Sequence, residues 1–260
     1  RNLYKNYLLK KIVIIPARLQ SERLPNKPLK LIGNRSMIQW TYQAALNSNA
    51  DEVYVATDSN KIKDLVESFN GKAFLTSSNH QTGTDRVFEV ANELNLSNED
   101  IVVNVQGDEP FIDPIDIDQI FNSFVAQFNE KNDLNEALSD AINHDICTLY
   151  SVVETGKNID DPNIVKVKVD ECISLDFSRK IIGDRSDWFV HQGIYGYRFK
   201  CLKDFVSWEQ TENEKINKLE QLRALDNGIL IKVLPSKSLF HLGVDTEEDL
   251  REANEIAKKF

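Results

Sequence analysis

Short apolar runs alternate with helical patterns along the first half of the chain. Four of these runs have the length and β-branched content of buried strands, and they cover 11–17, 51–58, 71–77 and 100–106. Apolar residues three or four positions apart predict helices at 36–48, 60–69, 83–94 and 114–128. Strict alternation of strand and helix is typical of an α/β fold with a doubly wound, mostly parallel sheet.

The pattern changes in the second half, where strands follow one another without long helices between them. β-rich runs occupy 146–153, 163–170, 172–177 and 189–199. They predict a β-rich antiparallel extension over 146–205 of the same domain. A helix is expected at 214–226, ending at Asn227-Gly228, then a strand at 229–235 and a helix at 246–260. With no internal repeat and no linker, we expect residues 1–260 to form a single domain.

Composition narrows the classes of function. The 260 residues are 41% hydrophobic, enough for a sizeable core, and carry a net charge of -10, which disfavours nucleic acid or a membrane surface as partner. Three widely spaced cysteines lack C-x-x-C spacing and predict reduced thiols in a cytoplasmic protein, without a disulfide framework or zinc. No apolar run reaches membrane-spanning length, and the early IVII run is too short for a signal peptide.

A cluster of cations follows the first predicted strand. Residues 16–30 carry four basic side chains against one acidic residue, in a chain with a large negative charge: Arg18, Arg23, Lys27 and Lys30. Ligands of doubly wound sheets bind outside the carboxyl ends of the strands. The loop is therefore either a polyphosphate site or simply solvated charge. It contains no glycine, so a dinucleotide-binding oxidoreductase is disfavoured.

Two aspartates also stand at predicted strand ends. Asp108 follows the strand at 100–106, and Asp245 follows a short apolar run before the last helix. Two such carboxylates suit Mg²⁺, which accepts one or two of them together with water and substrate phosphates. The alternative is that Asp245 and Thr246 only begin the last helix. Thr82 likewise either caps the helix at 83–94 or contributes to a nucleotide-binding loop.

Several motifs together resemble one enzyme family. IIPARLQSERLPNKPL, HQTGTDR, NVQGDEP, HQGIYGYR, LEQLR and GVDTEEDL occur here in the order typical of 3-deoxy-manno-octulosonate (Kdo) cytidylyltransferases, from about Lys11 to the C-terminus. The resemblance implies a nucleotide-diphospho-sugar transferase-like fold and a homodimer. It also implies transfer of CMP from CTP to the anomeric hydroxyl of Kdo, with release of pyrophosphate, for lipopolysaccharide biosynthesis. Mg²⁺ is the implied cofactor, and no nucleic acid or membrane insertion is expected.

The same resemblance assigns roles to individual residues. The implied catalytic residues are Arg18, Lys27, Asp108 and Asp245, of which Asp108 and Asp245 would hold Mg²⁺. The implied CTP-binding residues are Ala17, Arg18, Arg23, Lys27, Thr82, Gly83 and Gln106. The implied sugar-binding residues are Arg179, His191, Gln192, Tyr195, Glu220 and Gln221, with Arg179 expected to bind the carboxylate. The role of Glu109 stays open.

The chain departs from the family pattern at two places. Gly183 stands where proline is expected, and Phe240, His241 and Leu242 replace small residues before GVDT. These departures leave other sugar acids open, either 8-amino-Kdo, whose ammonium Glu220 or Asp184 would meet, or a nonulosonic acid. A protein that binds CTP without turnover is a further alternative.

Overall fold

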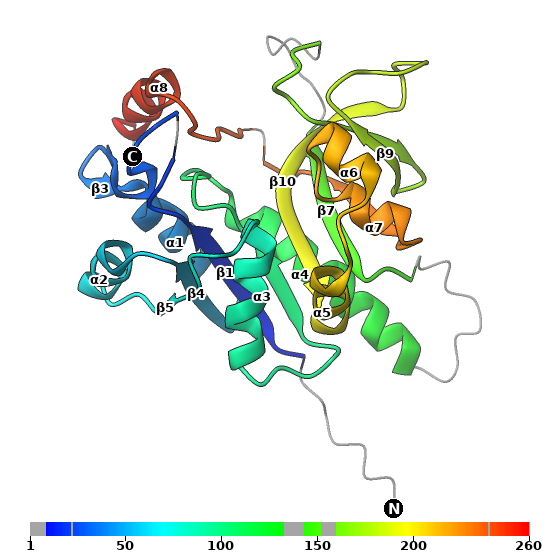
Figure 1. Cartoon of the computed structure of the whole chain (residues 1–260), viewed down its shortest axis with the longest axis horizontal. Coiled ribbons are helices and arrows are strands. Elements are labelled where there is room, and N and C mark those ends of the chain that lie inside the picture. The colour runs from blue at the N-terminus through cyan, green and yellow to red at the C-terminus, as the bar shows by residue number, and fades with distance from the viewer. Residues whose placement is uncertain (1–8, 22, 133–142, 152–159, 239, 260) are drawn as a thin grey trace, which may run out of the picture.

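The protein is described by a computed structural model covering residues 9–21, 23–132, 143–151, 160–238 and 240–259 (Figure 1). One nine-stranded mixed sheet runs through this part of the chain, in the order β5-β4-β1-β6-β10-β7-β11-β9-β8. Its strands are β1 (Lys11–Ala17), β4 (Glu52–Thr57), β5 (Ala73–Leu75), β6 (Ile101–Asn104), β7 (Ile146–Ser151), β8 (Lys166–Asp170), β9 (Ile173–Ser178), β10 (Trp188–Arg198) and β11 (Ile231–Pro235). A separate two-stranded ribbon joins β2 (Leu31–Ile32) to β3 (Arg35–Ser36).

The predicted change of strand direction is confirmed. β1 pairs in parallel with β4 and β6, and β4 pairs in parallel with β5. β10 then runs antiparallel to β6, β7 and β8, so the β-rich segment extends the same sheet. Only β11 returns parallel to β7. The carboxyl ends of β1, β4 and β6 consequently meet at one edge of the sheet, where ligands of such folds bind.

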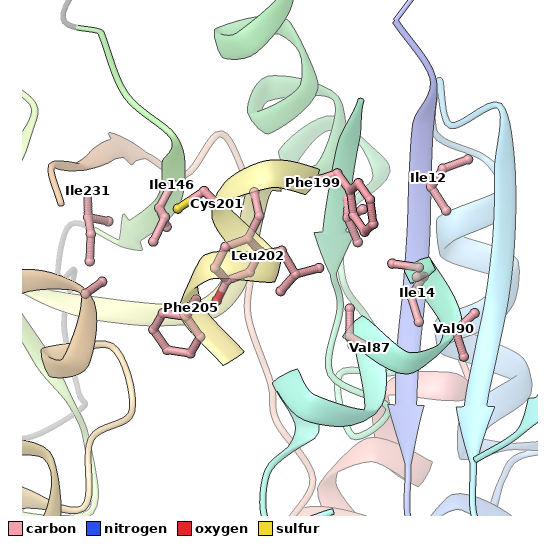
Figure 2. Packing of buried hydrophobic residues seen from close by; sticks show 14 of the residues in the cluster. Ile12, Ile14, Val87, Val90, Ile146, Phe199, Cys201, Leu202, Phe205 and Ile231 are labelled. Atoms are coloured by element: carbon pink, nitrogen blue, oxygen red, sulfur yellow. The ribbon is translucent and has the colours of Figure 1, made fainter. Parts of the chain in front are cut away.

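Helices cover both faces of the sheet. The helices are α1 (Met37–Leu46), α2 (Asn60–Ser68), α3 (Gly83–Glu93), α4 (Pro114–Asn132), α5 (Phe199–Ser207), α6 (Glu212–Asn217), α7 (Leu222–Asp226) and α8 (Glu247–Ala257), with a 3-10 turn η1 (Lys27–Leu29). Figure 2 shows Val87 of α3 and Phe199 of α5 beside Ile14 of β1, with Leu202 and Phe205 of α5 continuing the same core away from β1. Each buried side chain of this size contributes about 1.5–3 kcal/mol.

The opposite face buries residues from α1, α2 and α4. Ser36 caps α1, since its hydroxyl accepts a hydrogen bond from the Gln39 amide. Met37, Ile38 and Ala45 form the buried face of this helix, whereas Trp40 is half-buried. No helix in the described part of the chain is both long and apolar enough to cross a membrane.

One predicted helix needs correction, and one helix was not predicted. The helix expected at 214–226 is broken, because Lys218 adopts a left-handed conformation (φ 53°) that ends α6, and α7 begins only at Leu222. The predicted end of this helical segment is confirmed: Asn227 is the C-cap of α7, and Gly228 follows it with φ 76°. Helix α5 is an addition that the sequence pattern did not indicate. The break leaves residues 218–221 as an irregular turn.

A third, smaller core fixes the last helix. Leu242, Val244 and Ala253 pack with Leu24, Ile32 and Met37. This contact places the start of α8 beside the loop that follows β1, although the two segments lie at opposite ends of the sequence.

Candidate functional site

A lysine lies between two aspartates at the edge of the sheet. The Lys27 Nζ donates to Asp108 Oδ2 at 2.5 Å and to Asp245 Oδ1 at 2.9 Å. Arg23 Nη2 lies 2.9 Å from the other oxygen of Asp245. The Lys27 side chain is only 15% exposed. Two cations and two carboxylates from three distant segments therefore form one compact charged cluster.

Local structure explains how these side chains reach the cluster. Asn26 adopts a left-handed conformation (φ 56°) and begins η1, whose first residue is Lys27. Asp108 follows β6, and its carbonyl accepts a hydrogen bond of 2.9 Å from the Val244 amide. Thr246 and Asp249 form a capping box at the start of α8. The helix start thus needs Thr246 and Asp249, while the carboxylate of Asp245 is directed to the cations.

The charges in the cluster shift one another's ionisation. Burial lowers the pKa of Lys27, but Asp108 and Asp245 outweigh burial, so the pKa is raised above its ordinary value. Burial raises the pKa of Asp245, but Lys27 and Arg23 outweigh it, and the net effect is a lowered pKa. The ion pairs therefore keep Lys27 protonated and Asp245 ionised at neutral pH.

The candidate nucleotide residues also come together. A Cβ at Gly107 would approach the Pro16 carbonyl oxygen to 3.0 Å and the Ala17 side chain to 3.6 Å, so the chain after β6 passes directly against the end of β1. A Cβ at Gly83 would lie 3.5 Å from Pro16 and 3.9 Å from Gln106. Ala17, Gly83 and Gln106 thus surround one point at the strand ends. This arrangement gives an entering ligand close access to backbone atoms.

Two other predicted residues are held by structural hydrogen bonds. Arg18 Nη2 donates to the His80 carbonyl at 3.0 Å, which ties the loop after β1 to the loop before α3. The Thr82 hydroxyl accepts from the Asp85 amide, and Asp85 accepts in return, so Thr82 does cap α3. These hydrogen bonds do not exclude a contact with a ligand, because Arg18 and Thr82 both lie beside the group formed by Ala17, Gly83 and Gln106.

A second group of predicted site residues contains buried side-chain atoms that have no hydrogen-bond partner within the described chain. The Thr84 hydroxyl donates to Glu220 Oε2 at 2.9 Å, whereas Glu220 Oε1 and the Tyr195 hydroxyl make no hydrogen bond within the described chain. The amide of Gln192, 1% exposed, is also unpaired there. Unpaired buried polar groups are costly, so they indicate a place where a polar ligand supplies the missing bonds.

Burial also changes the ionisation of this second group. Burial raises the pKa of Glu220, against the opposing effect of Thr84, Thr82 and Arg223. Burial lowers the pKa of His191 to about 3, helped by His241. His191 is therefore neutral at physiological pH, with its Nε2 2.9 Å from the Thr148 hydroxyl.

A buried ion pair holds the turn that carries Glu220 and Gln221. Arg223 Nε and Nη2 bond to Glu214 at 2.8 Å and 2.6 Å, and both side chains are at most 5% exposed. The pair joins α6 to α7 across their break. Arg223 is the last residue of the LEQLR motif, but the sequence assigned no role to it or to Glu214, because their contact depends on the break itself.

The side-chain hydrogen bonds of Arg179 go to backbone carbonyls. Its guanidinium donates to the carbonyls of Pro162 and Asn163 at 3.4 Å and 3.3 Å. Within the described residues, no hydrogen bond or ion pair joins Arg179 to another predicted site residue. Its predicted role in binding a carboxylate stays a prediction.

Comparison with known proteins decides the family. The cytidylyltransferase family profile matches residues 12–233. A 3-deoxy-manno-octulosonate cytidylyltransferase from Saccharophagus degradans is 41% identical, covering 92% of this chain and 95% of that protein. The chain belongs to the 3-deoxy-manno-octulosonate cytidylyltransferase family. A relative of the same name from Vibrio parahaemolyticus is 39% identical, covering 95% of this chain and 98% of the relative.

A solved structure extends the likeness to three dimensions. CMP:2-keto-3-deoxy-manno-octonic acid synthetase, solved in complex with CTP, matches with a TM-score of 0.82 and 32% identity over 96% of this chain and 99% of that one. The fold and the family expected from the motifs are thus confirmed. As a cytidylyltransferase, the protein is a nucleotidyltransferase enzyme.

Proposed function

We propose that the protein transfers CMP from CTP to the anomeric hydroxyl of Kdo and releases pyrophosphate, a reaction that supplies lipopolysaccharide biosynthesis. The observation that carries the proposal is the cluster of Lys27, Arg23, Asp108 and Asp245 at the carboxyl edge of the sheet. The names of the relatives and the CTP complex of the structural neighbour support the same substrates.

In this reaction the anomeric oxygen attacks the α-phosphorus of CTP. A bond forms between that oxygen and phosphorus, the α–β phosphoanhydride bond breaks, and the hydroxyl proton leaves to solvent. Arg18, Arg23 and Lys27 are proposed to hold the triphosphate and to stabilise charge that grows on the leaving pyrophosphate. Ala17, Thr82, Gly83 and Gln106 are proposed to surround the cytosine and ribose.

Asp108 and Asp245 are the residues proposed to hold Mg²⁺. Both bond to one ammonium, so their oxygens are close enough for a single cation to meet both. Within the described chain no group of three or more acidic, histidine or cysteine side chains is placed to hold a metal ion, and Mg²⁺ needs only one or two carboxylates when substrate phosphates are present. When bound, it would neutralise phosphate charge and lower the pKa of the attacking hydroxyl. Lys27 and Arg23 together offset the two negative charges of the same carboxylates.

The sugar acid is proposed to occupy the space beside Glu220 and Tyr195, where Glu220 Oε1 and the Tyr195 hydroxyl make no hydrogen bond within the described chain, although Glu220 Oε1 lies 3.8 Å from Arg223 Nη2. His191, Gln192 and Gln221 are proposed to bind its hydroxyls, and Arg179 its carboxylate. Asp184 bonds to the Ser186 amide in an exposed loop, which leaves Glu220 as the better partner for the ammonium of 8-amino-Kdo. The β-rich extension is proposed as the wall of this pocket and as the surface of a homodimer, in a single domain that works in the cytoplasm.

Pyrophosphate release tests the proposal directly. Purified protein with Mg²⁺ is given CTP or UTP, together with Kdo, 8-amino-Kdo or a sialic acid. The proposal expects release with CTP and Kdo. A preference for 8-amino-Kdo would instead assign Glu220 to an ammonium. CTP binding without release for any acceptor would refute the proposed transfer.

A further inference from the structure

The chain between β11 and α8 is fastened along the chain that follows β6. Figure 1 shows this connection crossing from the β10–β11 side of the molecule to α8. Its contacts follow one another in antiparallel order, and we name them the cross-loop ladder. They are Gln119 to the Pro235 carbonyl (2.7 Å), Asp116 to Ser236 and Lys237 (2.6 and 2.8 Å), Phe111 to Phe240 (ring centroids 6.0 Å apart), Glu109 to His241 (3.3 Å) and the Asp108 carbonyl to the Val244 amide (2.9 Å).

Glu109 is the rung of this ladder that lies next to the charged cluster. Its Oε1 is 3.3 Å from His241 Nε2, and its side chain is 15% exposed. A Cβ at Gly243 would lie 3.1 Å from the same Oε1, so the carboxylate sits directly against the backbone two residues before Asp245. A larger residue at 243 would have to displace Glu109.

The contact of Glu109 with His241 and Gly243 matters because these residues are close in sequence to Asp108 and Asp245. Glu109 directly follows Asp108, while His241 and Gly243 lie four and two residues before Asp245. Among the contacts of the cross-loop ladder, the Asp108–Val244 hydrogen bond and the Glu109 contact lie nearest to the two aspartates. Loss of the Glu109 contact would let the two carboxylates separate, and a cation that meets both would bind less tightly.

We propose that Glu109, through His241 and Gly243, is a positioning residue that holds Asp108 and Asp245 at the spacing where one cation meets both carboxylates. The proposal rests on the proposed function for the identity of that cation. The geometry of the ladder does not depend on the cation, so it can be tested in metal-free protein. His241 also interacts electrostatically with His191, which makes Glu109 the cleaner residue to change.

The test compares Glu109→Gln, His241→Gln and the double variant with Glu248→Gln, which removes an exposed carboxylate three residues after Asp245. Hydrogen exchange of the Val244 amide is measured without metal. Binding of Mn²⁺, a probe for Mg²⁺, is measured in the presence of CTP by electron paramagnetic resonance. We expect both single variants to speed Val244 exchange and weaken Mn²⁺ binding by about tenfold. The double variant should be no worse than the stronger single variant, because both break one contact, and Glu248→Gln should match wild type.

Kinetics separate positioning from general damage. Glu109→Gln should raise the Mg²⁺ concentration for half-maximal rate by about tenfold, while kcat at saturating Mg²⁺ stays within about twofold of wild type. Wild-type Val244 exchange and Mn²⁺ binding in both single variants, or effects that simply add, would overturn the proposal. If Glu109→Gln does not fold, His241→Gln and Gly243→Ala give the same readouts. Asp108→Asn serves as the reference for the metal itself: wild-type Mn²⁺ binding there would refute the metal site, while Val244 exchange would still decide the ladder.

Discussion

Replacing Lys27 by Met tests the charged cluster without relying on catalysis. The change removes the ammonium that Asp108 and Asp245 share and leaves two carboxylates whose bonded oxygens are no more than about 5 Å apart. At an effective dielectric constant of about 20, their repulsion is about 3 kcal/mol. Asp245 is 43% exposed, so solvent screens much of this repulsion, and we expect a net loss of about 1–2 kcal/mol in the free energy of unfolding. For a chain of this size the melting temperature should fall by about 2–8 °C.

The dependence on pH and Mg²⁺ makes this prediction specific. The raised pKa of Lys27 means that its stabilisation is complete below pH 10.5 and is lost as pH rises through its folded-state value. The lowered pKa of Asp245 means that its share is present above pH 3.8 and is lost as pH falls through its own folded-state value. The difference in melting temperature between Lys27→Met and wild type should therefore keep its full size between about pH 6 and 9 and should shrink in acid. Mg²⁺ should raise the melting temperature of the variant more than that of wild type.

Lys30→Met is the matched control, because Lys30 lies on the same loop and pairs with an exposed carboxylate, that of Glu247. Such surface pairs contribute about 0–1 kcal/mol. Thermal melts with and without Mg²⁺, followed by CTP kinetics, complete the assay. Lys27→Met should also lower kcat/KM for CTP by about 100-fold. Equal melting temperatures and an equal Mg²⁺ response in Lys27→Met and wild type would refute the account of Lys27 as the resident counterion.

Four further substitutions probe the remaining parts of the site. Asp108→Asn and Asp245→Asn should fold but lose about 100-fold or more in turnover, and near-wild-type rates at limiting Mg²⁺ would remove the metal-ligand assignment. Glu220→Gln should raise KM for the sugar acid with little change in KM for CTP. It should also melt higher than wild type at pH 7, with the gain shrinking towards pH 4, because the raised pKa of Glu220 makes its ionised form unfavourable in the fold; an unchanged melting temperature would contradict its burial as an anion. Arg223→Met should cost about 3–5 kcal/mol by leaving the buried Glu214 carboxylate unpaired, as a urea unfolding curve would show, and a loss under 1 kcal/mol would contradict this.

The sequence predicted the sheet better than it predicted the second helical layer. Strands buried on both faces are continuous apolar runs, so β1, β4 and β6 were recognisable from local pattern alone. Helix α5 was not, because it begins directly after β10 with no turn residue between them. The break between α6 and α7 has no local signal either, since Lys218 is an ordinary helix former in a left-handed conformation.

The site was predictable where it depends on strand ends and unpredictable where it depends on contacts between loops. The rule for ligands of doubly wound sheets placed Asp108 at the edge. It did not show that Lys27 would lie between Asp108 and Asp245, since that contact depends on the small core around Leu242 and Val244. The open question about Glu109 could not be answered from sequence for the same reason.

Irregular backbone coincides with the proposed site. Lys27 follows the left-handed Asn26, Glu220 follows the left-handed Lys218, and the register of β10 shifts between Gln192 and Tyr195. The other non-glycine residues with positive φ lie in turns that simply reverse the chain: Asn70, Asn95, Glu171 and Cys172.

A regular helix or strand would carry each of these side chains one step further along its own axis. The irregularities change the direction of the backbone next to Lys27, Glu220 and Tyr195, and so set the direction in which these side chains project. Local rules therefore fail in this protein at the places where three separate elements each deliver a proposed ligand-binding side chain. If the irregularities were incidental, a substitution that favours regular helix, such as Lys218→Ala, would stabilise the fold and leave KM for the sugar acid unchanged. We expect no such gain: Lys218 already pays the cost of about 1 kcal/mol that a Cβ meets in the left-handed conformation, and alanine carries the same Cβ, so Lys218→Ala should not stabilise the fold. Lys218→Gly, which removes that cost and keeps the break, should stabilise the fold by about 1 kcal/mol and leave KM for the sugar acid unchanged.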